Sequence, residues 1–115
     1  MNIEKIEKTI KKFSDERNWE QFHNPKNLSM ALSVEASELL EIFQWLTFEQ
    51  ASNLDEKRKE HAKQEIADIA IYLIRMSMKL NINLEEAILE KMVLNEKKYP
   101  LLDENGNKIE YGKKD

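Results

Sequence analysis

The chain has 115 residues, of which 35% are charged and 41% hydrophobic, with two glycines, two prolines and no cysteine. Its length favours one domain, and its scarcity of glycine, proline and β-branched residues other than isoleucine favours an all-α fold over a sheet-based one. The net charge of −4 argues against nucleic acid as a partner. The absence of cysteine excludes disulfides. Together with the lack of any membrane-spanning or signal-peptide stretch, it leads us to expect a cytoplasmic protein without a membrane partner.

Four main helices are predicted, and the first spans about residues 2–14. Its apolar side consists of Ile3, Ile6, Ile10 and Phe13. The other side carries lysine and glutamate, so this helix covers a core with one face. A short aromatic segment, DERNWEQFH, follows over residues 15–23. Asn24 and Pro25 are typical of an N-cap and a first helical residue, which predicts a second helix to about Leu46.

A polar connection over residues 47–54 leads to the third helix, expected at about 55–80. Its second half, IADIAIYLIRMSMKL, is apolar nearly all round. Such a helix is buried on most sides, which one chain of this size does not easily provide, so we expect a homo-oligomer. A fourth helix over 84–97 is opened by an Asn83–Glu86 capping pattern. We expect two parts: a helical domain over residues 1–100 and a polar tail over residues 101–115.

The second helix carries two glutamates against its own apolar face. On the helical rhythm this face comprises Leu28, Ala31, Leu32, Glu35, Leu39, Ile42 and Leu46. Glu35 occupies the position of a core leucine, and Glu38 borders the same face three residues later. An unpaired buried carboxylate costs several kcal/mol or becomes protonated, so these two acids require a partner.

A second acid pair, Glu65 and Asp68, has the same spacing in the third helix. Because a modest connection joins the second and third helices, we expect them to run antiparallel and side by side, which brings four carboxylates together. Four negative charges cannot share a partly desolvated pocket without cations. No basic residue occupies the neighbouring positions on the second helix. An all-oxygen ligand set suits Mg²⁺ or Mn²⁺.

Two other interpretations of these residues compete with a magnesium site. Acids three apart on a helix usually lie on a solvated surface, although two such pairs against apolar faces of successive helices are much less common. A di-iron bundle requires a Glu-x-x-His motif on each of two helices. Glu20 and His23 match one copy, but the other histidine, His61, has Arg58 at that spacing, so the second copy is missing.

Three aromatic residues are candidates for stacking on a nucleobase: Trp19, Trp45 and Tyr72. Tyr72 follows Asp68 by one helical turn and therefore lies on the metal side of its helix. Gln21 or His23 is suited to reading the polar edge of a base. The alternative is that the tryptophans and Phe22 fill the core.

In the fourth helix, Lys91 and Asn95 are four residues apart on the flank of the apolar stripe. This position suits a contact with phosphate oxygens. Lys91 equally fits a surface lysine whose aliphatic stem packs on the helix.

Four segments, WEQFHNPKNL, EASELLEIFQW, EIADIAIYLI and KMVLNEKKYP, resemble in order and spacing the MazG-like all-α nucleoside triphosphate pyrophosphohydrolases, most closely the dCTP pyrophosphatase branch. The resemblance implies a four-helix MazG-like bundle assembled as a homo-dimer or homo-tetramer. It implies metal ligation by Glu35, Glu38, Glu65 and Asp68. It implies substrate contacts by Trp19, Glu20, Gln21, Phe22, His23, Trp45, Tyr72, Lys91 and Asn95.

The implied reaction is Mg²⁺-dependent hydrolysis of a (d)NTP to a (d)NMP and diphosphate, with Mn²⁺ as a second candidate ion. The expected substrate is dCTP or a modified pyrimidine deoxynucleotide, and the expected role is sanitation of the nucleotide pool. We expect Glu38 or Glu35 to orient or deprotonate the attacking water. Two alternatives stay open: a non-catalytic nucleotide- or metal-binding regulatory module, and a helical interaction protein whose acids are structural.

Overall fold

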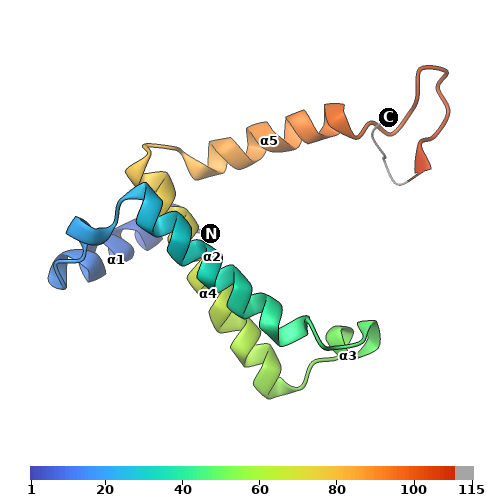
Figure 1. Ribbon diagram of the computed structural model, residues 1–115. Coiled ribbons are helices and arrows are strands. Elements are labelled where there is room, and N and C mark those ends of the chain that lie inside the picture. The colour runs from blue at the N-terminus through green and yellow to red at the C-terminus, as the bar shows by residue number, and fades with distance from the viewer. Residues whose placement is uncertain (111–115) are drawn as a thin grey trace. The chain divides into compact units, whose positions relative to one another are not determined.

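The computed structural model describes residues 1–110, and its elements are all helical (Figure 1). They are α1 (Ile3–Glu16), the 3₁₀ helix η1 (Glu20–Phe22), α2 (Pro25–Phe43), α3 (Phe48–Ser52), α4 (Glu56–Lys79) and α5 (Leu84–Lys98). Within the described residues, β geometry is confined to one isolated bridge between Leu102 and Lys108. The expected all-α class is therefore confirmed.

The chain divides into two compact units, Met1–Asn81 and Ile82–Asp115. The first unit contains α1, η1, α2, α3 and α4, and the second contains α5 and the segment after it. The boundary expected after residue 100 stays a prediction, and the last part of the expected tail, residues 111–115, lies outside the described residues.

Side-chain caps fix where the helices begin. Asn24 accepts a hydrogen bond from the backbone N–H of Asn27 at 2.8 Å, with Pro25 in the first turn, as the sequence indicated. Asp55 caps α4 in the same way. Asn83 accepts from the N–H of Glu86 at 3.1 Å, which is the first of the two bonds of the expected capping box. These short polar side chains satisfy N–H groups that have no partner inside their helix.

The connection between α2 and α4 differs from the expectation of a polar loop, because it contains α3. Thr47 accepts a hydrogen bond from the N–H of Gln50, and the side chain of Gln50 accepts from the N–H of Thr47. This reciprocal capping box stabilises a helix of only five residues. The second helix is correspondingly shorter than expected and ends at Phe43 instead of Leu46.

The antiparallel pair of α2 and α4 is the centre of the first unit (Figure 1). The predicted inward face of α2 is confirmed: Leu28 is 1% exposed, and the other six members of the face are half-buried. Glu41, one turn beyond Glu38, is exposed. The helical rhythm thus placed the two glutamates Glu35 and Glu38 correctly beside the neighbouring helix.

The helix α1 packs against α4 and adds Ile10 to a small core that also includes Leu28, Ala62 and Ile74. Large apolar side chains on the same helices remain exposed, among them Ile66 and Leu73 of α4. The apolar second half of α4 is therefore only partly covered by the first unit. No helix among residues 1–110 combines the length and the hydropathy needed to cross a bilayer.

Candidate metal centre and adjoining pocket

Three carboxylates from two helices converge between α2 and α4. Glu35, Glu38 and Glu65 each offer an oxygen, and these oxygens all lie within 4.8 Å of one another. Glu35 and Glu38 come from successive turns of one face of α2, and Glu65 comes from the facing turn of α4. The predicted convergence of the two acid pairs is present for three of the four acids.

Burial makes this cluster electrostatically costly for the protein alone. Glu65 is 8% exposed, and Glu35 Oε2 and Glu65 Oε2 are enclosed without a hydrogen-bond partner among residues 1–110. The pKa of Glu35 is raised to about 7, chiefly because a protonated Glu35 can hydrogen-bond to the neighbouring Glu65 carboxyl, and further by desolvation and the charge of Glu38. The cluster is thus tolerated only with a bound proton or a bound cation.

The donor set fits a divalent cation. Two enclosed carboxylate oxygens have no hydrogen-bond partner among residues 1–110, and their lone pairs could coordinate a hard cation. Carboxylate oxygens are the ligands that Mg²⁺ and Mn²⁺ prefer. His61 lies beside the cluster, with its Nε2 3.4 Å from Glu65 Oε1. Its contact is with the other oxygen of Glu65, so it leaves Oε2 without a partner.

Asp68 lies one turn further along α4 and outside the group of three whose oxygens meet. Its charge still contributes to the raised pKa of Glu35. Asp68 also lines a pocket of about 340 Å³, so it links the carboxylate cluster to that pocket.

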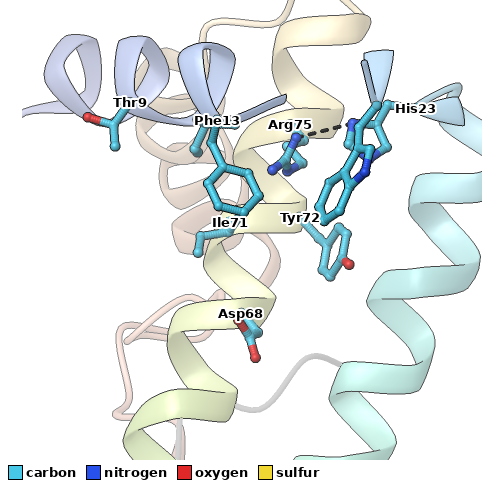
Figure 2. A pocket seen from close by; sticks show the side chains of 9 residues that line it. Thr9, Phe13, His23, Asp68, Ile71, Tyr72 and Arg75 are labelled. Carbon is cyan, nitrogen blue, oxygen red and sulfur yellow. Dashed lines mark hydrogen bonds between the residues drawn. The ribbon is translucent and has the colours of Figure 1, made fainter. Parts of the chain in front are cut away.

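The pocket is formed by α1, α4 and the segment around η1 (Figure 2). Its walls are largely aromatic: Phe13, Trp19 and Tyr72 line it, with His23 beside them. Trp19 meets the ring of Phe13 edge-on with centroids 5.4 Å apart. Flat rings of this kind suit a planar heteroaromatic ligand. Two of the three predicted stacking aromatics, Trp19 and Tyr72, therefore line one pocket together with His23 and Asp68.

At the end of the pocket beneath α1 lies Arg75, which is 9% exposed (Figure 2). Its Nη1 donates hydrogen bonds to the hydroxyl of Ser14, which is fully buried, and to His23 Nδ1 at 3.1 Å. Since a guanidinium only donates, His23 is the neutral tautomer with its proton on Nε2. Burial, followed by the charge of Arg75, lowers the pKa of His23, and burial also lowers the pKa of Arg75.

The other predicted contacts in the aromatic segment point elsewhere. Glu20 forms an ion pair with Lys79. Gln21 donates a hydrogen bond from Nε2 to the backbone oxygen of Asn18 at 3.0 Å. Phe22 is exposed. None of Glu20, Gln21 and Phe22 lines the aromatic pocket, and their substrate contacts stay predictions.

Three further predicted contacts lie away from the pocket or in the other unit. Trp45 is 87% exposed just after α2 and does not line the pocket. Lys91 and Asn95 belong to α5, where Lys91 is exposed and Asn95 half-buried. Their roles stay predictions.

Sequence reasoning missed Arg75 and Ser14. The signal for Arg75 was present, since it follows Asp68 by seven residues and Tyr72 by three and so shares their face of α4. Ser14 carried no comparable signal, because a serine near the end of a helix is ordinarily a solvated residue. Only the packing of α1 on α4 shows that its hydroxyl is buried.

Comparison with known proteins identifies a family that matches most of the chain. The model of the MazG-like family matches residues 30–113. The dCTP pyrophosphatase 1 of Bos taurus is 37% identical over 111 residues, which cover 95% of this chain and 66% of that protein. The Homo sapiens protein of the same name is 38% identical over 100 residues, covering 85% and 59%. The chain thus spans somewhat less than two thirds of the length of these curated relatives.

A solved structure is also similar. A crystal structure described as a pyrophosphatase from Archaeoglobus fulgidus matches with a TM-score of 0.82 and 40% sequence identity. The match covers 87% of this chain and 94% of that one.

Proposed function

Because the chain belongs to the MazG-like family, we propose that it is a nucleoside triphosphate pyrophosphohydrolase. It would convert a (d)NTP and water to a (d)NMP and diphosphate. The names of the relatives, dCTP pyrophosphatase 1, favour dCTP or a modified pyrimidine deoxynucleotide as substrate. The proposed role is sanitation of the nucleotide pool, and the proposed compartment is the cytoplasm. The observation that carries the proposal is the convergence of Glu35, Glu38 and Glu65 beside an aromatic pocket.

We assign the metal site to Glu35, Glu38, Glu65 and Asp68, with Mg²⁺ as the ion and Mn²⁺ as its substitute. When bound, such an ion neutralises phosphate oxygens and lowers the pKa of a coordinated water. The two enclosed oxygens of Glu35 and Glu65 support this assignment, because a cation removes the cost of their burial.

The remaining chemistry is the activation of water and the placement of the substrate. Glu38, on the turn of α2 after Glu35, is the proposed base that orients the water and accepts its proton, with Glu35 as the alternative. Trp19 and Tyr72 hold the nucleobase of the substrate between their aromatic faces. This arrangement keeps the triphosphate near Asp68, at the carboxylate end of the pocket.

The chain is proposed to act as a homo-dimer or homo-tetramer that completes a four-helix bundle. Exposed apolar residues on α4, such as Ile66 and Leu73, support this, since a second chain would cover them. Trp45, Lys91 and Asn95 remain proposed substrate contacts in that assembly, as do Glu20, Gln21 and Phe22.

A panel of nucleoside triphosphates incubated with the protein and Mg²⁺ tests the function. Release of diphosphate and a nucleoside monophosphate is the expected result, and it should require Glu65. Glu65→Gln is therefore compared with a control variant, Glu41→Gln. Glu41 is an exposed glutamate near the C-terminus of α2. Saturable nucleotide binding without product would favour a regulatory module. Release of orthophosphate would indicate a different bond cleavage, and both outcomes contradict the proposal.

A further inference from the structure

Arg75 is a buried cation whose hydrogen bonds use only part of its guanidinium. The side chain is 9% exposed, and it forms no ion pair with an acid among residues 1–110. Its two hydrogen bonds, to Ser14 and His23, both start from Nη1. The edge formed by Nε and Nη2 has no hydrogen-bond partner among the described residues. Neither atom is among the enclosed side-chain atoms that lack a partner, and Arg75 lines the pocket, so both donors are accessible to a ligand.

The tether at Nη1 holds the free edge in place. Ser14 on α1 and His23 after η1 accept from the two N–H groups of Nη1, so the planar group is fixed from two sides. The neutral state of His23, whose pKa burial lowers, removes a competing positive charge from its neighbour. The free Nε and Nη2 donors therefore form a pre-oriented fork, a shape that recognises two adjacent acceptors at once.

The position of Arg75 along α4 decides which part of a nucleotide it meets. Asp68 and Arg75 both line the pocket, and a separation of seven residues places them on one face, about 10 Å apart along the helix axis. Asp68 is at the carboxylate end, whereas Arg75 lies beneath α1 with Tyr72 between them (Figure 2). A triphosphate held by the carboxylates would leave the base, not the phosphates, next to Arg75.

We propose that Arg75 is a base-specificity residue, whose Nε and Nη2 donate to N3 and O2 of a cytosine held between the aromatic walls. Cytosine presents these two acceptors side by side, whereas thymine and uracil carry a hydrogen on N3 that opposes the fork. The inference rests on the proposed function, which supplies the pyrimidine nucleotide. It adds the residue that would distinguish one pyrimidine from another.

The test compares kcat/KM for dCTP and dTTP in the wild type and in Arg75→Lys, which keeps the charge and loses the fork. We expect the variant to lose roughly 10- to 100-fold for dCTP, the range for one bidentate contact to a base, and far less for dTTP. The matched control is Arg58→Lys, the same change at an exposed arginine of α4 that does not line the pocket; its preference for dCTP should persist. Equal losses for both nucleotides in Arg75→Lys would overturn the inference.

A change in the substrate keeps the test valid if the Arg75 variant does not fold, which its melting curve will show. In 3-deaza-dCTP the N3 acceptor is replaced by a C–H group. The wild type should process it roughly 10- to 100-fold less efficiently than dCTP. Equal efficiency would contradict the inference while leaving the proposed hydrolysis intact. Absence of diphosphate from every nucleotide would instead reject the proposed function and this inference with it.

Discussion

Glu35 of α2 and Glu65 of α4 face each other across the helix pair, and each has one enclosed carboxylate oxygen without a hydrogen-bond partner among residues 1–110. Both oxygens would be hydrogen-bonded or solvated if they stabilised the metal-free protein. Their arrangement instead destabilises the ionised, metal-free state. The consequences of this relationship for activity, stability and ion binding can be measured.

Neutralising one member of the pair should abolish most of the activity. We expect Glu35→Gln and Glu65→Gln each to lower kcat by roughly 10²- to 10³-fold. Each variant would lose one charged ligand of the proposed ion, which neutralises charge on the phosphate. Steady-state release of diphosphate measures this. Glu41→Gln should retain wild-type rates, since Glu41 is exposed and outside the cluster. Full activity of Glu65→Gln would remove the cluster from the mechanism.

The metal-free protein should become less stable as the pH rises through about 7. The folded-state pKa of Glu35 is raised to about 7 from its usual 4.5, so the folded protein binds this proton more tightly than the unfolded chain. The resulting stabilisation is complete below about pH 4.5 and is lost as the pH rises through 7. Urea unfolding with a chelator, between pH 6.5 and 8.5, measures the loss.

Two comparisons isolate the Glu35 contribution. Glu35→Gln should remove this part of the pH dependence. His23 acts in the opposite direction, because its lowered pKa makes the protein lose stability as the pH falls below its usual 6.5. A wild type and a Glu35→Gln variant with identical pH profiles would contradict the raised pKa.

The fluorescence of the two tryptophans can show whether a nucleotide binds in the pocket. Trp45→Phe leaves Trp19, which lines the pocket, as the only tryptophan, and Trp19→Phe leaves Trp45, which is 87% exposed. Nucleotide binding should change the fluorescence of the Trp45→Phe protein strongly, because the base stacks beside Trp19. If the nucleotide binds saturably but the fluorescence of Trp19 does not change, the nucleobase lies outside this pocket.

The exposed apolar side of α4 predicts self-association. Leu73→Glu places a charge on a 42% exposed leucine, so we expect it to dissociate the proposed homo-oligomer without unfolding the chain. Light scattering after size exclusion gives the mass, and circular dichroism checks the fold. Lys59→Glu, a change at an exposed residue in the charged part of the same helix, is the control and should leave the mass unchanged. A monomeric wild type would contradict the assembly.

The helices were predictable from the sequence because local rules governed them. Apolar spacing identified the buried side of α2, and the caps at Asn24 and Asn83 marked two helix starts. The short α3 was missed, because its five residues carry little periodic signal and its capping box lies in a segment that is polar overall. The end of α2 was placed three residues late, since helix termini depend on the turn that follows.

The site was predictable only where charge conflicts with burial. Glu35 was identified because a carboxylate on an apolar face has a cost that the sequence alone makes visible. Arg75 was overlooked, since a lone arginine in an apolar helix is usually a surface residue with its charge in water. Its partner Ser14 is distant in the sequence, and no local rule relates the two. Contacts of this kind come from the packing of α1 against α4.

Binding of Mn²⁺ to the metal-free protein at pH 8, followed by the electron paramagnetic resonance signal of the free ion, tests the account most directly. Above the raised pKa of Glu35 the cluster is ionised, so the wild type and Glu41→Gln should remove free Mn²⁺ saturably. The double variant Glu35→Gln, Glu65→Gln should not. Equal uptake by the double variant, or no uptake by the wild type, would contradict a divalent-cation site between α2 and α4.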